Sequence, residues 1–82
     1  MKMDEIFEKV VALAAKKFGV NKSDTSKNTS FCVFGCDGEN KNEFIVHDVG
    51  ADFDLNISTD EAWDISTIGS LCEVIKSKQY QF

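Results

Sequence analysis

The stretch FDLNISTDEAWDISTIGSLCEVI, residues 53–75, contains the clearest local signals for structure in this chain. Ser58 and Glu61 have the spacing of a capping box, in which the Ser hydroxyl accepts from the backbone N–H of the Glu, and the Glu carboxylate accepts from that of the Ser. This pattern predicts a very short helix that opens at the box and runs through Trp63. We expect the apolar residues that flank it, Phe53 and Trp63, to pack against the core.

A second, longer helix follows directly in the same stretch. Ser66 or Thr67 is expected to begin it, and Lys76 and Lys78 lie in its last turn, where cations suit the helix dipole. Its apolar residues recur at helical spacing and form one inward stripe. The members of this stripe are Ile68, Leu71, Cys72 and Ile75.

The N-terminal segment predicts the firmest helix of the chain, from Asp4 to Phe18. Lys16 and Lys17 fall in its last turn, and Gly19 supplies a left-handed stop. Apolar residues recur there in steps of three and four, which is the pattern of a helix with one buried side. They are Ile6, Phe7, Val10, Val11, Leu13, Ala14 and Phe18.

The middle of the chain predicts a long loop and one more helix. VNKSDTSKNTS, residues 20–30, is polar without periodicity, and we expect this surface loop to lie across the helices. Asp37 is expected to cap a helix that runs to about Ala51, and Gly38 and Gly50 weaken its two ends. The inner side of this helix is expected to carry Phe44, Ile45, Val49 and Phe53.

These elements predict an all-α fold: a small four-helix bundle with three longer helices, one short third helix and a long loop after the first helix. Strand-like alternation is scarce. The chain has 82 residues, of which 43% are hydrophobic, so it allows one compact domain, residues 1–82, with one modest core. No internal repeat or Pro-rich linker divides it.

Charge and cysteine content narrow the function classes. A formal net charge of -5 disfavours nucleic acid and anionic membrane surfaces as partners. No apolar run is long enough to span a membrane, so we expect a cytoplasmic monomer. The spacing of Cys32, Cys36 and Cys72 fits neither a zinc knuckle nor a redox pair, and we expect buried free thiols.

The order of these parts resembles the acyl carrier protein family. The match is best across residues 53–75, which are similar to the carrier pattern of Phe-Asp, an Ile, an acidic pair with Ala, and Ile-x-Thr before an amphipathic helix. Upstream, FGVNKSDTSKNTSF, residues 18–31, is similar to the carriers' exit from the first helix and to the Ser-Phe pair before their functional turn. The resemblance covers nearly the whole chain and implies the four-helix carrier fold.

The resemblance also implies where the prosthetic group should be. In carriers an Asp-Ser-Leu turn begins the second helix, and its serine is esterified by 4′-phosphopantetheine. Here Asp37 matches the aspartate, Gly38 stands in place of the serine and Glu39 in place of the leucine. The second helix looks one residue longer than usual, so the alignment can slide by one residue. Residues 31–57 contain no serine or threonine at all, and sliding therefore restores no attachment site.

A protein of this kind is expected to have no catalytic residues, no metal and no cofactor. His47 with Cys36 as a nucleophile pair is disfavoured, and so is a calcium loop at residues 52–63. The family presents acids of its second helix to basic patches on protein partners, which here implies binding by Glu39, Glu43, Asp48 and Asp52.

The first interpretation is thus a non-catalytic interaction or regulatory protein with a degenerate prosthetic site, similar to serine-less carrier-like proteins of bacteria. The alternative is an atypical acyl carrier in fatty-acid, lipid or polyketide biosynthesis. In that alternative the pantetheine or acyl group is held elsewhere, for instance as a thioester on Cys36 near a helix N-terminus.

Overall fold

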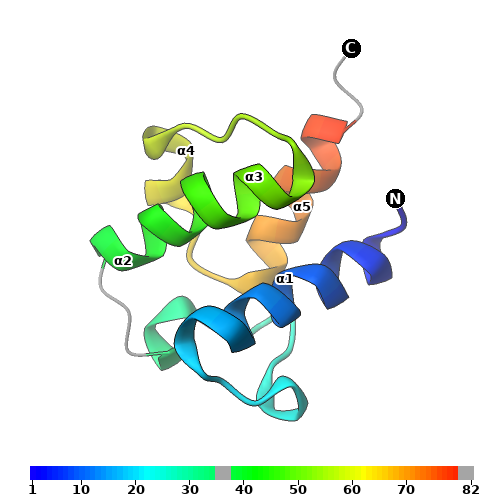
Figure 1. The fold of residues 1–82 in the computed structure, drawn as a ribbon, viewed down its shortest axis with the longest axis vertical. Helices are drawn as coiled ribbons and strands as arrows, with labels where there is room; N and C mark the ends of the chain where they lie inside the picture. The colour runs from blue at the N-terminus through cyan, green and yellow to red at the C-terminus, as the bar shows by residue number, and fades with distance from the viewer. Residues whose placement is uncertain (35–37, 80–82) are drawn as a thin grey trace.

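The structure is a computed structural model that describes residues 1–34 and 38–79, with the backbone alone at residues 33 and 34. Figure 1 shows helices gathered around one core. Within the described residues no strand forms, and an isolated bridge joins Ser30 to Thr67. The predicted all-α bundle is confirmed. Its elements are α1 (Met3–Phe18), η1 (Lys22–Asp24), η2 (Phe31–Phe34), α2 (Gly38–Glu43), η3 (Phe44–Val49), α3 (Gly50–Phe53), α4 (Thr59–Asp64) and α5 (Ile68–Gln79).

Helix α1 begins and ends close to where its sequence predicts. Acids lie in its first turn and Lys16 and Lys17 in its last turn. Gly19 ends it at φ 71°, the left-handed region that suits glycine, and donates its N–H to Ala15 O at 2.9 Å. The buried side of α1, which packs against α5, consists of Ile6, Val10, Val11 and Ala14.

The second helix is continuous from residue 38 to residue 53 and comprises α2, η3 and α3 (Figure 1). Its middle turn, η3, is a π-helix, in which Gly50 N–H donates to Ile45 O five residues back. The buried residues repeat at the same five-residue interval: Phe44 and Ile45 are buried, and so are Val49 and Gly50. A turn of this width accommodates one residue more than an α-helical turn.

The end of the second helix differs from the sequence-based expectation. The helix continues to Phe53, and Asp54 ends it with φ 55°. Leu55 N–H donates to Gly50 O at 2.8 Å and Asp54 N–H to Ala51 O at 3.3 Å, the two bonds of a Schellman motif. Gly50 therefore does not stop the helix. It leaves room for the turn, since a Cβ there would lie 3.0 Å from Leu55 O.

The long loop after α1 caps the N-terminus of α5. Thr29 O accepts from Ile68 N–H at 3.0 Å, and Lys27 O accepts from Gly69 N–H at 2.8 Å. Of the two expected first residues, Thr67 is the cap, because its Oγ1 accepts from the backbone N–H three residues later at 3.1 Å. The loop lies across the bundle as predicted and satisfies amides that an isolated helix would leave unpaired.

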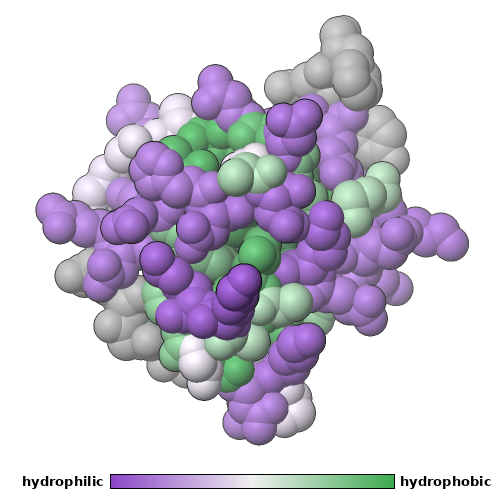
Figure 2. Space-filling model, in the orientation of Figure 1, coloured by the Kyte–Doolittle hydropathy of each residue, from purple (hydrophilic) through white to green (hydrophobic). Residues whose placement is uncertain are grey.

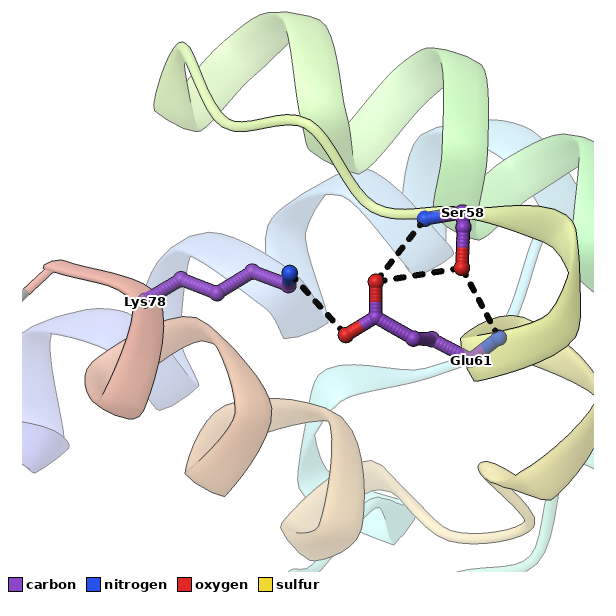
Figure 3. A network of polar contacts seen from close by, with 3 residues as sticks. All are labelled: Ser58, Glu61 and Lys78. Atoms are coloured by element: carbon purple, nitrogen blue, oxygen red, sulfur yellow. Dashed lines mark hydrogen bonds and ion pairs between the residues drawn. The ribbon is translucent and has the colours of Figure 1, made fainter. Parts of the chain in front are cut away.

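The capping box of α4 forms as predicted and is joined to α5 (Figure 3). Glu61 N–H donates to Ser58 Oγ at 3.1 Å, and Ser58 N–H donates to Glu61 Oε1 at 3.1 Å. Lys78 Nζ lies 2.9 Å from Glu61 Oε2. The hydrogen bond from Lys78, with those from Ser58, holds the pKa of the Glu61 carboxyl below its usual value. The ionised Glu61 carboxylate therefore stabilises the fold at a pH above the ordinary carboxyl pKa. This stabilisation is lost as the pH falls through the lowered pKa of Glu61.

The core confirms most of the predicted inward residues and corrects two expectations. Ala62 of α4 is buried, whereas its neighbour Trp63 is 56% exposed, because successive residues of a helix point about 100° apart. Cys72 is buried as expected, and Cys32 is exposed. The buried hydrophobic residues are Ile6, Val10, Val11, Ala14, Phe31, Phe44, Ile45, Val49, Phe53, Ile57, Ala62, Ile65, Ile68, Leu71, Cys72 and Ile75.

The outer surface is mainly polar. Hydrophilic side chains cover most of the face seen in Figure 2, and hydrophobic surface is visible between them. Among the helices of residues 1–34 and 38–79, none is long and apolar enough to cross a membrane.

Removing the cap hydroxyl of α4 should destabilise the protein measurably. We expect Ser58→Ala to lower the free energy of unfolding by about 1 kcal/mol, because Glu61 N–H then loses its acceptor. Urea unfolding followed by far-ultraviolet dichroism measures the change. Ser77→Ala, on the exposed side of α5, is the matched control and should stay within about 0.5 kcal/mol of wild type. Equal effects of the two variants would contradict the role of the box.

Candidate functional site

The candidate site is the start of the second helix, where the sequence aligns with the prosthetic turn of carriers. Gly38 is the first residue of α2, and Glu39 beside it is exposed. The expected cap Asp37 and the thiol of Cys36 lie outside the described residues. The structure therefore describes Gly38 and Glu39, the two positions that the sequence pattern aligns with the serine and the leucine of the carriers' turn.

An indole ring lies directly over Gly38. A Cβ built on this residue would be 2.5 Å from Trp63 Cζ3 and 2.8 Å from Trp63 Cη2. Separations of this kind are well below van der Waals contact between carbon atoms. The contact with Gly38 explains why Trp63 is only partly exposed although it points away from the core. Position 38 accepts glycine and, with the ring in place, no larger residue.

Lys41 fixes α4 against the second helix one turn further on. Its Nζ donates to Ile65 O at 2.6 Å and to Trp63 O at 3.4 Å, so a cation satisfies carbonyls at the C-terminal end of α4. The same Nζ lies 5.9 Å from the centroid of the Trp63 ring. The sequence pattern predicted no such role for Lys41, since it lies among polar residues and its acceptors are more than twenty residues away.

Asn42 lies on the same face of the second helix as Gly38, one turn later, and is 7% exposed. Its Oδ1 is buried and has no hydrogen-bond partner among residues 1–34 and 38–79. An unpaired buried carbonyl oxygen costs about 1 to 3 kcal/mol, and native proteins contain few of them. The inner stripe predicted from apolar residues began at Phe44 and did not include this position.

The acids expected to bind a partner lie on the outer surface of the second helix, but three of them are paired within the chain. Lys17 Nζ lies 4.0 Å from Glu43 Oε1 and 3.7 Å from Asp48 Oδ2. Asp52 Oδ2 lies 3.2 Å from Nζ of Lys9, which also lies 4.7 Å from the centroid of the Phe53 ring. These pairs are exposed and each is worth little in stability, but they reduce the negative field of this face. Glu39 has no ion pair among the described residues.

The surroundings of His47 and Cys72 differ, and Cys36, the thiol considered with His47 from the sequence, lies outside the described residues. His47 is exposed on η3, beside an open groove of about 630 Å³ between α1 and the second helix. Burial raises the pKa of the Cys72 thiol to about 11, so the thiolate needed for nucleophilic attack is scarce at neutral pH. No group of three or more His, Cys, Asp or Glu side chains in residues 1–34 and 38–79 is arranged to hold a metal ion.

Two comparisons with known proteins bear on the whole chain. No protein-family model matches it. A curated protein named acyl carrier protein, from Lactobacillus acidophilus, is 36% identical over 80 residues. The match covers 96% of this chain and 99% of that relative, so it extends through every element described above.

Replacing Asn42 by a side chain of the same shape should stabilise the protein. Leucine has the same branching as asparagine and no acceptor, so Asn42→Leu removes the penalty of the unpaired Oδ1. We expect the free energy of unfolding to rise by about 1 kcal/mol. Asn56→Leu, at an exposed position between α3 and α4, is the control and should change it little. A loss of stability in Asn42→Leu would contradict an unpaired Asn42.

Proposed function

The chain belongs to the acyl carrier protein family, and from this premise we propose that it works by binding another protein and carries no covalently attached prosthetic group. Proteins of this family are carriers rather than catalysts, which agrees with a non-enzymatic role. The proposed protein is cytoplasmic and monomeric, with a degenerate attachment turn at Asp37, Gly38 and Glu39.

The absence of a hydroxyl side chain carries this proposal. Family members attach 4′-phosphopantetheine through an ester to a serine at the start of the second helix. From residue 31 to residue 57 this chain has no Ser, Thr or Tyr that could form such an ester. Counting from the start of the helix assigns the serine position to Gly38, and sliding by the one additional residue assigns it to Glu39. Neither can be esterified by the arm.

The residues around the turn do not fit the arm either. A side chain on residue 38 would overlap the Trp63 ring. The contacts of Lys41 with Ile65 O and Trp63 O hold α4 close to this end of the helix. The proposed function therefore does not involve a prosthetic arm attached at this turn.

Protein binding is the property of the family that these residues still support. The acids proposed for docking remain exposed or half-buried on the outer side of the second helix, and they suit a partner with a basic patch. Glu39 lies at its N-terminal end and keeps its charge unpaired by the described lysines. The full set proposed for docking is Glu39, Glu43, Asp48 and Asp52.

The alternative remains an acyl carrier of unusual type that holds its group on Cys36. The two proposals differ in covalent chemistry, because a thioester on that residue would add mass that hydroxylamine removes. Wild type and Cys36→Ala, isolated from the same cells, therefore separate the two without any assumption about a partner.

A phosphopantetheinyl transferase supplied with coenzyme A should leave this protein unmodified. The physical reason is the missing hydroxyl across residues 31–57. Intact-mass spectrometry measures the result, and an ordinary acyl carrier protein in the same reaction is the positive control. A mass gain of one 4′-phosphopantetheine per chain would overturn the proposed function.

Partner binding should depend on the acids of the second helix and on salt. We expect Glu39→Lys to reduce the protein captured from a native lysate at low ionic strength, because a basic patch then meets a like charge. Salt should weaken capture by wild type, since the Debye length is only about 10 Å at 0.1 M. Quantitative mass spectrometry of the captured proteins gives the comparison.

Glu5→Lys is the control for this experiment, since Glu5 is an exposed acid in the first turn of α1. Reversal of Glu43 or Asp48 is less clean, because either new lysine would also face Lys17. Equal capture by wild type, Glu39→Lys and Glu5→Lys at all salt concentrations would show that the second helix is only a solvated surface.

A further inference from the structure

We propose that the Trp63 ring sterically blocks residue 38, the position where carriers have their attachment serine. Attachment is then prevented both by this ring and by the missing hydroxyl. This inference rests on the proposed function and extends it. Loss of the serine alone would leave a turn that a single substitution could restore. If Trp63 blocks the position, a serine at residue 38 does not restore attachment until the indole is also removed.

The first support is the geometry at residue 38. Two carbons of the Trp63 six-membered ring approach the ideal Cβ position to 2.5 and 2.8 Å. At Gly69 the obstacle is different, because a Cβ there would lie 2.8 Å from the backbone oxygen of Lys27. At Gly38 the obstacle is one side chain, and a single mutation can remove it.

The second support is the set of contacts that keep the ring in place. Lys41 Nζ binds the carbonyl oxygens of Trp63 and Ile65, and it lies over the same indole. On the other side of Trp63, Ala62 is fully buried and holds α4 against the core. The backbone of residue 63 is thus held on both sides, and a serine at residue 38 must displace the ring rather than the helix.

The third support is exposure. Trp63 is 56% exposed, whereas Phe31, Phe44 and Phe53 are buried, and two further phenylalanines are partly buried against the core. An exposed indole on a six-residue helix gains little from the core, so core packing does not account for its position. Its contact with Gly38 does, because a Cβ at residue 38 would overlap the ring and only glycine lacks one.

The test compares serine variants with and without the indole. Gly38→Ser and the double variant Gly38→Ser/Trp63→Ala are incubated with a phosphopantetheinyl transferase and coenzyme A, and mass gain is followed with time. We expect the double variant to be modified at least about tenfold faster, since overpacking a close contact generally costs as much as the ~1.4 kcal/mol that a factor of ten represents. Gly38→Ser/Asp64→Ala, altered at the exposed neighbour on the same helix, should behave like Gly38→Ser alone.

Fluorescence gives a second readout that does not depend on the transferase. Trp63 is the protein's single tryptophan, so all tryptophan emission comes from this ring. We expect Gly38→Ser to shift the emission to longer wavelength, as the displaced ring becomes more exposed, while Glu39→Ala leaves it unchanged. Dichroism checks that every variant keeps the helical fold.

The outcomes separate this inference from the proposed function. Modification of the wild-type chain would overturn the proposed function, and the fluorescence readout would still test the block. Equal rates of modification in Gly38→Ser and in the double variant, including no modification of either, would overturn the inference. So would an unchanged tryptophan emission in Gly38→Ser.

Discussion

Burial of one face of the second helix is the constraint on which the rest of this structure depends. That face passes from Gly38 through Ile45 and Val49 to Phe53, and it meets both α1 and α4. The π turn η3 keeps the buried pairs on the core side at an interval of five residues. With this face turned inward, three acids of the helix, Glu43, Asp48 and Asp52, lie where lysines of α1 reach them.

The same orientation explains the candidate site. The first residue of the helix lies under α4, so its side chain competes for space with whatever α4 presents there. This chain presents an indole, and residue 38 is a glycine. Lys41 then joins the two helices through the carbonyl oxygens at the end of α4. The chain keeps the fold of its family, and under the proposed block the turn that would carry the prosthetic group is closed, which leaves the outer surface for the proposed partner binding.

Signals that are local in sequence predicted their structures well. Gly19 ends α1, the box of Ser58 and Glu61 begins α4, and Thr67 caps α5, because each depends on residues within a few positions of one another. Where the outcome depends on distant residues, the sequence was insufficient. The exposure of Trp63 follows from which side of α4 meets the core, and the salt bridges of Asp48 and Asp52 follow from how α1 crosses the second helix. The predicted end of the second helix was wrong for a similar reason. Asp54, not a glycine, takes the left-handed conformation that ends the helix, and Gly50 leaves room for the Schellman turn that follows.

The central claim is that this carrier-family chain acts without a prosthetic arm, and the intact mass of the protein isolated from its native cells tests it most directly. The account predicts a mass with no contribution beyond the polypeptide itself, before and after hydroxylamine treatment. A chain that bears 4′-phosphopantetheine, or an acyl group that hydroxylamine releases, would contradict it.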